Sequence, residues 1–395
     1  GELISDDGRI ANTGRTAYWD AAWQQFTGKP LLGEGPRSFS YHFNKNFPEG
    51  FWVGTRTPRN VHNDYLQTLA EYGLIGGVLA ALFLITHIGR GLRYLAWFRN
   101  RRFARDGTRF SNSLALVVGA LAAAATYLVH SLFDFNMHLL ANASLMAFTF
   151  GILASPGFRV RQGEAIPGAA QRIFVGKALV PLAAVSILLL GWKHTHTDIL
   201  LRRGEAAMVA GDEGQAIADL RAVAEADPDN FRAIKNLAVI RFNKIYEEGL
   251  PDFIAVSYAK AALSGFEAAL ELHPYDYLSM VYAARCNTYL AVFETDPGAR
   301  AARLAEASRA LKGASDWAPK RFEPATWRGA LLRTRANLAE IEEEPARALA
   351  LARESLESFE YAVSRTPMRM RGNTPQERGL LEMRKAVARL SNANG

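Results

Sequence analysis

Four long apolar stretches restrict the fold of this chain more than any other feature of its sequence. They cover residues 74–98, 113–133, 139–154 and 174–192. A helix that crosses a hydrocarbon layer of about 30 Å needs roughly 20 apolar residues, so 139–154 is short and the other stretches are long enough. The second stretch, SLALVVGALAAAATYLVHSLF, lacks the polar face that a surface helix of a soluble protein shows at the helical period. We therefore predict four transmembrane helices within residues 74–193.

The positions of the positive charges predict how these helices are oriented, because Lys and Arg concentrate in short cytoplasmic connections. Seven arginines surround the connection between the first two stretches, against the single acid Asp106. The next connection, FDFNMH, has no Lys or Arg, and the one after it is basic again. This alternation places residues 1–73 and 194–395 outside the cytoplasm. For a bacterial inner membrane, that side is the periplasm.

Composition excludes several other classes of protein and site. The net charge of +7 could indicate nucleic-acid binding, but the arginines lie beside apolar segments, where membrane topology explains them. The single cysteine, Cys286, excludes an internal disulfide and a cysteine-based metal site, and we expect it in a helix core. His194 and His196 form an HTH sequence without further ligands, so we predict neither a metal ion nor a cofactor.

Residues 194–395 have the pattern of a soluble helical-repeat domain. Amphipathic segments rich in Ala, Leu, Glu and Arg alternate with prolines at intervals of about 46 residues, a period typical of stacked helix pairs. The prolines are Pro228, Pro274, Pro319 and Pro367. The first unit resembles a tetratricopeptide repeat in its small residues and its proline, whereas later units contain insertions such as KIYEEGLPDFIA. We predict an all-α chain in which a polytopic membrane region precedes a tetratricopeptide-like α-solenoid. The solenoid could hold a protein partner or only brace the membrane region.

The first 73 residues contain aromatic and basic side chains in a helical pattern. Arg15, Trp19, Trp23 and Phe26 share one side of a predicted helix, which suits either the membrane interface or packing on protein. The segment GEGPRSF lacks the Gly-Lys-Ser/Thr ending of a nucleotide-binding loop, so its glycines, Gly33 and Gly35, predict a tight turn.

Arginines on the outer side are unusual, because the positive-inside rule disfavours them there. Arg15, Arg37, Arg56 and Arg59 make such a basic cluster. A guanidinium can bind phosphate oxygens through two parallel hydrogen bonds, so the cluster suits a diphosphate. Alternatively, these are solvated loop arginines.

The segment PRNVHNDYLQTLAEYG contains the candidate general base. Pro58 and Asn60 predict the start of a helix, and Gly73 predicts its end or a kink. His62 then falls in the first turn, where the helix dipole keeps an imidazole neutral, as a general base must be. The alternative is that His62 only caps or packs the helix.

Four blocks in order, R-x-x-x-W at Arg15 and Trp19, PLLGEGPRSF, HNDYLQTLAEYGLIGG and HSLFDFNMHLLANASLMAFTFGIL, resemble the O-antigen ligase and polymerase superfamily. The resemblance covers about residues 12–155, and members of this superfamily often carry carboxy-terminal tetratricopeptide repeats. It implies a metal-independent membrane glycosyltransferase, surrounded by membrane lipids, that moves a glycan from undecaprenyl diphosphate to an acceptor hydroxyl on the periplasmic face.

The resemblance also implies roles for individual residues. His62 would deprotonate or orient the acceptor hydroxyl, and Arg15 matches the arginine of the family motif. Arg37, Arg56 and Arg59 are assigned to the diphosphate by charge and proximity alone. Asn63 and Glu71 match the motif and are expected to support the site. A further block contributes His130, Asp134 and His138 at the outer helix ends, and Asp134 could equally be a helix cap.

The family's amino-terminal membrane helices do not occur in these 395 residues. We therefore expect the chain to be the carboxy-terminal portion of such a protein, with a site that needs the other helices to be complete. The rival hypothesis is a non-enzymatic membrane scaffold that displays its helical repeats to partner proteins. It predicts that function depends on the repeats and not on Arg15 or His62.

Overall fold

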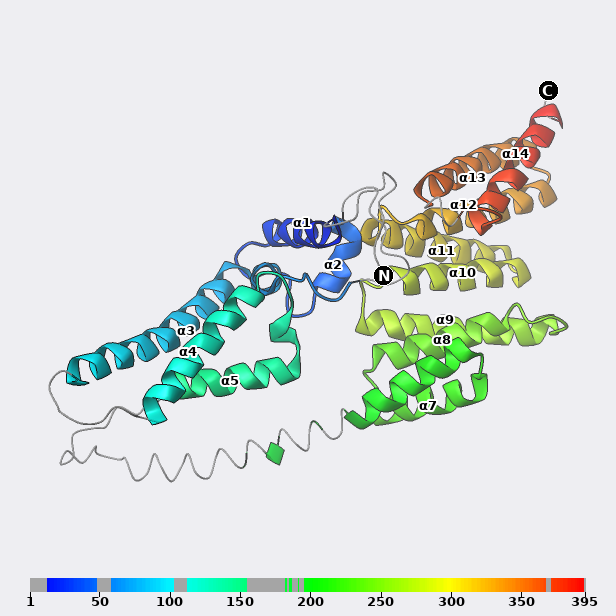
Figure 1. Cartoon of the computed structure of the whole chain (residues 1–395). Helices are drawn as coiled ribbons and strands as arrows, with labels where there is room; N and C mark the ends of the chain where they lie inside the picture. The colour runs from blue at the N-terminus through cyan, green and yellow to red at the C-terminus, as the bar shows by residue number, and fades with distance from the viewer. Residues whose placement is uncertain are drawn as a thin grey trace. The chain divides into compact units, whose positions relative to one another are not determined.

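A computed structural model of the chain describes residues 13–47, 58–102, 112–154, 195–366 and 371–393, with a few single residues between 182 and 191. Within these ranges every regular element is a helix, which confirms the predicted all-α fold class. The chain divides into two compact units, residues 1–167 and 168–395. Each unit is described by itself below (Figure 1).

Unit 1 contains the first three predicted membrane segments as helices. Its elements are α1 (Thr13–Gly28), α2 (Phe39–Asn46), α3 (Asp64–Arg102), α4 (Asn112–His130), the 3-10 helix η1 (Asn136–His138) and α5 (Leu140–Ala154). Both α3 and α4 are long and apolar enough to cross a membrane, and α5 is a shorter apolar helix. The predicted fourth segment, 174–192, lies almost entirely outside the described residues.

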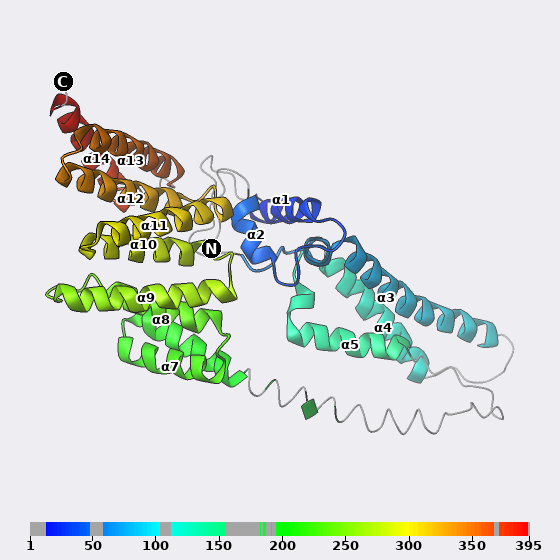
Figure 2. The same ribbon diagram turned by 180° about the vertical axis from the view of Figure 1, so that it is seen from behind.

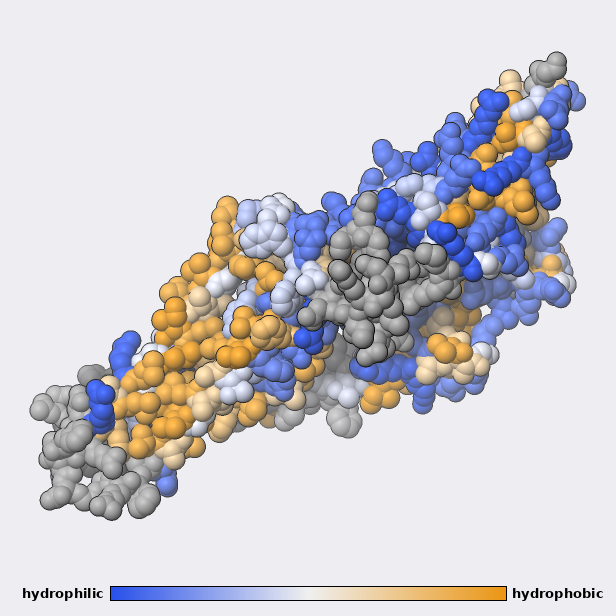
Figure 3. Space-filling view, turned by 45° about the horizontal axis from the view of Figure 1, so that its top comes forward, coloured by the Kyte–Doolittle hydropathy of each residue, from blue (hydrophilic) through white to orange (hydrophobic). Residues whose placement is uncertain are grey.

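The surface of α3 and α4 explains why these helices need a membrane. Large apolar side chains such as Leu79, Ile85 and Leu116 are more than half exposed. In Figure 3 the face drawn is orange over this helical region and mostly blue over the repeat helices. Water would solvate such an apolar surface unfavourably, whereas lipid tails match it.

Helix α3 is interrupted at Gly73, and the loop between α1 and α2 supplies the hydrogen-bond partners that α3 lacks there. Gly73 has φ 65° and ψ −167°, which breaks the helical hydrogen-bond pattern. The backbone N–H groups of Leu74 and Ile75 instead donate to the carbonyls of Pro30 and Leu31, at 2.8 and 3.2 Å. In return, the N–H groups of Glu34 and Gly35 donate to α3 carbonyls at 3.2 and 2.9 Å. The predicted break at Gly73 is therefore a kink inside a longer helix.

The crossing of this loop over α3 requires glycine on both sides. A Cβ atom on Gly33 would lie 2.4 Å from the Glu71 carbonyl carbon, and one on Gly73 would lie 2.3 Å from the Leu31 carbonyl oxygen. These distances are far inside van der Waals contact. Gly33 and Gly35 both have positive φ, as expected for the predicted tight turn.

Helix α1 packs on α2 and α3 through its alanines and through Trp19 of the aromatic stripe. Ala21 and Ala22 are buried against Phe39, Phe43 and the residues preceding α3. Trp23, by contrast, is 51% exposed and contacts Phe26. The helix is thus packed on protein through its alanines, while part of the aromatic stripe remains open to the surroundings.

Unit 2 is a stack of helices joined by short turns (Figures 1 and 2). Residues 195–210 are helical. They precede α7 (Glu213–Ala226), α8 (Phe231–Lys244), α9 (Asp252–Leu272), α10 (Tyr277–Phe293), α11 (Pro297–Trp317), α12 (Phe322–Ile341), α13 (Pro345–Arg365) and α14 (Pro375–Ala393). Pro228, Pro274 and Pro319 lie in turns between helices, as predicted, and Pro367 lies outside the described residues.

The repeat helices form two layers. Helix α10 contacts both α8 and α12, and α12 contacts α14, whereas no comparably extensive contact joins α9, α11 and α13 in this part of the structure. The helices α8, α10, α12 and α14 therefore make the closer-packed inner layer. Cys286 of α10 is a free and fully buried thiol in this core, as predicted.

Helix α9 shows why composition alone is an incomplete guide to membrane spans. Its length and apolar composition would allow it to cross a membrane. However, Ala259, Ala262 and Phe266 are completely buried in the core shared with α8 and α10. We assign α9 to the solenoid, because the face that contains these residues is covered by protein.

Candidate functional site

His62 lies in the loop just before α3 and is held by α1. The indole Nε1 of Trp19 donates to the backbone carbonyl of His62 at 3.3 Å. The imidazole stacks on Tyr18, with ring centroids 5.9 Å apart. It also forms a T-shaped pair with Phe135, with ring centroids 4.7 Å apart. Burial raises the pKa of Tyr18, which keeps its phenol neutral beside the imidazole.

The prediction that His62 falls in the first turn of the helix is wrong. Asn63 is the capping residue, because its side-chain oxygen accepts from the N–H of Leu66 at 3.0 Å and α3 begins at Asp64. His62 therefore precedes the helix, with a positive φ of 56°. This conformation is uncommon for a residue with a Cβ atom, and such strain concentrates at functional sites.

Two histidine–carboxylate pairs connect the start of α3 to the segment between α4 and α5. Nδ1 of His62 lies 3.4 Å from Oδ1 of Asp134. Reciprocally, Nδ1 of His138 lies 3.0 Å from Oδ1 of Asp64. The other oxygen of Asp64 accepts from the N–H of Met137 at 3.1 Å, so this buried carboxylate is well satisfied. The HND block and the DFNMH block are thus brought together, although about 70 residues separate them.

The two pairs differ in their environment. The side chain of Asp64 is completely buried, whereas those of His62 and Asp134 are 32% and 36% exposed. Nδ1 of His62 is buried and has no hydrogen-bond partner among the described residues, so its contact with Asp134 is electrostatic and not a well-aligned hydrogen bond. Asp134 also accepts from the N–H of Phe135 at 2.9 Å. It therefore accepts a local backbone hydrogen bond and is also a neighbour of His62.

Glu71 supports the loop that contains His62 through hydrogen bonds that pass by way of Gln67. Oε1 of Glu71 accepts from the Gln67 amide at 3.0 Å, and the Gln67 oxygen accepts from the N–H of Val61 at 3.0 Å. All three residues are buried. Sequence reasoning identified Glu71 but missed Gln67. The signal that could have found it is the i, i+4 spacing of the two residues on one face of α3.

The predicted arginines are free of ion pairs within the described part of the chain. Arg15 lies one turn before Trp19 on α1, and therefore on the side of the helix that covers His62. Arg59 is three residues before His62, and Arg37 lies in the turn before α2 with φ 59°. All three side chains are exposed. Arg56 lies outside the described residues.

His130 is not part of the His62 cluster. Its Nδ1 contacts the amide nitrogen of Asn136, and the Asn136 oxygen accepts from Asn142 at 3.2 Å. This arrangement fixes the corner between α4 and α5. Beside it, the hydroxyls of Tyr127 and Ser131 are buried without a hydrogen-bond partner in the described residues.

A further titratable pair in unit 1 joins α2 to the loop before it. His42 of α2 is buried, with Nε2 at 3.8 Å from Oε2 of Glu34. Burial lowers the pKa of His42, against the opposing effect of Glu34. Across the described ranges, no three His, Cys, Asp or Glu side chains converge as metal ligands, and His194 lies outside those ranges.

Comparison with known proteins supports the sequence resemblance over part of the chain. Residues 3–81 match the O-antigen ligase family. The exopolysaccharide production protein ExoQ of Rhizobium meliloti (strain 1021) is 30% identical over 77 residues, which are 19% of this chain and 18% of that protein. The predicted resemblance is therefore confirmed for the segment that contains His62, Asn63 and Glu71.

The repeat helices were also compared with solved structures. A thermophilic TPR protein of Thermus thermophilus aligns with 49% of this chain and 98% of its own, at 16% identity and a TM-score of 0.30. The assignment of a solenoid rests on the helix packing described above.

Proposed function

We propose that this chain, whose residues 3–81 are similar to O-antigen ligases, forms part of a bacterial enzyme of polysaccharide assembly. In this proposal it transfers a glycan from undecaprenyl diphosphate to an acceptor hydroxyl at the periplasmic face of the inner membrane. The observation that carries the proposal is the position of His62, which lies beside Asp134 at the entrance to an apolar helix.

In this proposal His62 is the general base. With Nδ1 facing the Asp134 carboxylate, the other ring nitrogen, Nε2, can take a proton from the acceptor hydroxyl. The acceptor oxygen then forms its bond to the anomeric carbon of the donor, and the bond from that carbon to the diphosphate oxygen breaks. Asp134 stabilises the imidazolium that forms, as a carboxylate does in other histidine-based sites.

The leaving diphosphate needs positive charge, since it takes the electron pair of the broken bond. Arg15, Arg37 and Arg59 can supply it, because their guanidinium groups are exposed and pair with no carboxylate in the described residues. We retain Arg56 in this set on its charge and position in the sequence. Guanidinium donors match phosphate oxygens in geometry, so the proposed step needs no metal ion to neutralise the leaving group.

Other residues position His62 and do not contact substrate in this proposal. Asn63 caps α3, Glu71 and Gln67 hold the backbone at Val61, and Asp64 fastens the start of α3 to His138. These contacts surround a residue with a left-handed backbone conformation. They stabilise the strained backbone of His62 and hold its imidazole in one orientation.

The ends of the membrane helices are consistent with a site at one membrane surface. The N–H of Asp64, at the start of α3, donates to the carbonyl of Ser131, just after the end of α4, at 2.9 Å. The basic connection between the same two helices joins their opposite ends. We therefore propose that residues 1–73 and the repeat domain occupy the side away from that connection. The protein partner expected for the repeat domain stays a prediction.

The test is transfer of a glycan from an undecaprenyl-diphosphate donor in reconstituted vesicles. We expect His62→Ala to lower the rate by about 10²-fold or more, the usual contribution of a general base. His196→Ala is the matched control, because His196 is exposed at the start of the repeat domain. Transfer at the wild-type rate by a folded His62→Ala protein would remove His62 from the mechanism.

A further inference from the structure

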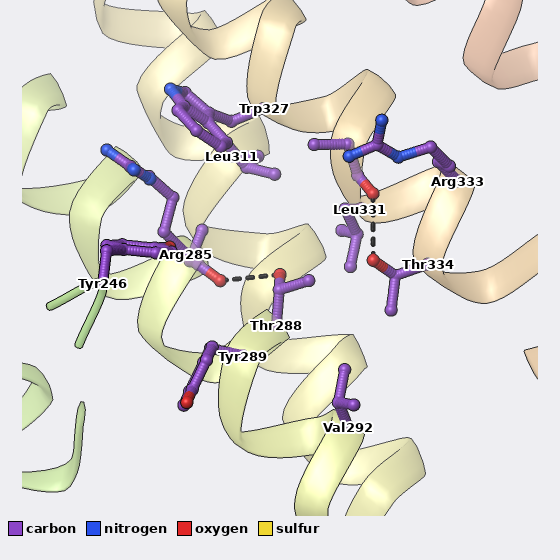
Figure 4. A pocket seen from close by; sticks show the side chains of 12 residues that line it. Tyr246, Arg285, Thr288, Tyr289, Val292, Leu311, Trp327, Leu331, Arg333 and Thr334 are labelled. Carbon is purple, nitrogen blue, oxygen red and sulfur yellow. Dashed lines mark hydrogen bonds between the residues drawn. The ribbon is translucent and has the colours of Figure 1, made fainter. Parts of the chain in front are cut away.

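The inner layer of the repeat domain contains a cavity of about 190 Å³ that the proposed transfer site does not use. It lies between α10 and α12, with Leu311 of α11 behind it. Figure 4 shows Arg285 beside Trp327, with Arg333 across the cavity. The cavity has the volume of about six water molecules, enough for a single sugar ring and too small for a folded segment.

Arg285 is held in an unusual way at one end of the cavity. Its guanidinium carbon lies 3.7 Å from the centroid of the Trp327 ring and 4.3 Å from that of Phe242. Aromatic rings attract the cation through their faces, and the guanidinium also hydrogen-bonds to the Tyr246 side chain. Nε of Arg285 is buried and has no hydrogen-bond partner in the described residues. The side chain is thus fixed in position, with a donor that protein atoms do not satisfy.

The charge of the cavity is positive. Among the residues that line it, two are arginines and none is an aspartate or glutamate. Arg333 forms an ion pair with Glu382 of α14, outside the lining. Arg285 forms no ion pair within the described part of unit 2, so aromatic rings and Tyr246 hold its cation without a carboxylate to neutralise it. A buried cation of this kind is costly unless an anion joins it.

We propose that this cavity binds the carboxylate-bearing sugar unit, of the hexuronate class, of an acidic glycan. The sugar carboxylate would lie in the plane of the Arg285 guanidinium and accept two parallel hydrogen bonds. The Tyr289 ring offers an apolar surface to the C–H face of the sugar ring. The hydroxyl oxygens of Thr288 and Thr334, which donate to carbonyls of their own helices, can accept from sugar hydroxyls.

The choice of a saccharide among carboxylate ligands rests on the proposed glycan transfer. If the repeat domain lies on the same side of the membrane as the transfer site, the transferred glycan is within its reach, and the positive charge of the cavity selects an acidic sugar unit. A peptide of acidic side chains would present the same charge. It would need an extended groove with further backbone partners, whereas this cavity is local and formed mainly by two helices.

The experiment titrates the full chain in detergent, in the His62→Ala background, with trigalacturonate as the probe. Maltotriose is the neutral probe, and pentaglutamate tests the peptide alternative. We expect trigalacturonate to bind and maltotriose to bind at least about tenfold more weakly, since a charge-assisted hydrogen bond contributes about a factor of ten or more. Arg285→Met should lower the affinity for trigalacturonate by a similar factor. Arg309→Met, which removes an exposed arginine of α11 outside the cavity, should not.

A second variant separates recognition from folding. Arg285→Lys keeps the charge and loses the planar fork, so we expect weakened binding of trigalacturonate by a variant whose circular dichroism spectrum shows that it is folded. Equal binding of maltotriose, tighter binding of pentaglutamate, or undiminished binding by the folded Arg285 variants would overturn the proposal. Transfer is measured separately on the chain with native His62. His62-dependent transfer without trigalacturonate binding rejects this inference alone, whereas binding without any transfer rejects the proposed function.

Discussion

His62 is positioned by residues far from it in the sequence. Tyr18 and Trp19 contact it from α1, and Asp134 and Phe135 contact it from the segment after α4. Because its neighbours come from α1 and from the segment after α4, the imidazole is positioned only when both are assembled on the start of α3. This arrangement favours a precise function for His62 over a merely local capping role.

Asp134→Asn tests the contact between the carboxylate and the imidazole. The amide removes the negative charge that stabilises the imidazolium, so we expect kcat for glycan transfer to fall about tenfold to a hundredfold while KM for the donor changes little. The pair is partly exposed, and such pairs contribute only about 0–1 kcal/mol to the free energy of unfolding. The variant should therefore fold normally, as judged by circular dichroism.

Asp20→Asn is the control for Asp134→Asn. Asp20 is an exposed carboxylate of α1 that contacts only Gln24 among the residues described here. Its loss should leave kcat unchanged. An Asp134→Asn enzyme with wild-type kcat would show that Asp134 acts only through its hydrogen bond with the N–H of Phe135.

The site was predictable from the sequence as a set of residues but not as a set of contacts. His62, Asn63, Glu71, Asp134 and His138 stand in recognisable blocks. Their pairing depends on the packing of α3 against the α4–α5 corner, which no local pattern encodes. The helix start was misplaced for a related reason: Pro58 and Asn60 are good start signals, but Asn63 provides the cap.

At the scale of elements, the α1–α2 loop and the kink of α3 form one structural unit. The loop replaces the hydrogen bonds that α3 loses at Gly73, and α3 in turn accepts hydrogen bonds from Glu34 and Gly35. Glycines in PLLGEG and EYG are required because two backbones cross in direct contact. The sequence predicted a turn and a kink separately. It could not show that each one completes the other.

Gly33→Ala and Gly73→Ala should each disrupt this crossing. An added Cβ would overlap backbone atoms that cannot move independently, at positions where φ is also positive. We expect each variant to lose about 2 kcal/mol or more of stability, within the range for strained backbone positions. The measurement is the unfolding temperature of the purified protein in detergent.

Gly28→Ala is the matched control for the two glycine variants. Gly28 ends α1, and a Cβ atom there would meet no atom within 4 Å. It should change the unfolding temperature little. Equal stability of the wild type and Gly33→Ala would mean that the loop does not cross α3 as closely as described.

The sequence predicts the turns of the solenoid more clearly than it distinguishes a solenoid helix from a membrane helix. The turns between solenoid helices contain the recurring prolines, so the sequence indicated where these turns lie. The length and apolar composition of α9, in contrast, match those of a membrane span. Only its packing shows that Ala259 and Phe266 face protein and not lipid.

At the scale of the whole molecule, the orientation in the membrane decides whether the proposed site and the repeat domain can act on the same glycan. Both must lie on the side opposite the arginine-rich connection. We predict that a cysteine at Ala104 is labelled only from the cytoplasm, because arginines hold that connection inside. Cysteines at Gln24 and Arg309, both exposed, should be labelled from the periplasm.

The native chain allows this experiment with little background, since its single thiol, Cys286, is fully buried. A membrane-impermeant maleimide is added to cells whose outer membrane alone has been permeabilised, and labelling is repeated after lysis. The unmodified chain is the control for reaction at Cys286. Labelling at 104 and none at 24 before lysis would reverse the orientation and put His62 in the cytoplasm, where the proposed donor is not presented. Labelling at 24 but not at 309 would leave the transfer site in place and separate it from the Arg285 cavity, so that the two could not bind one glycan.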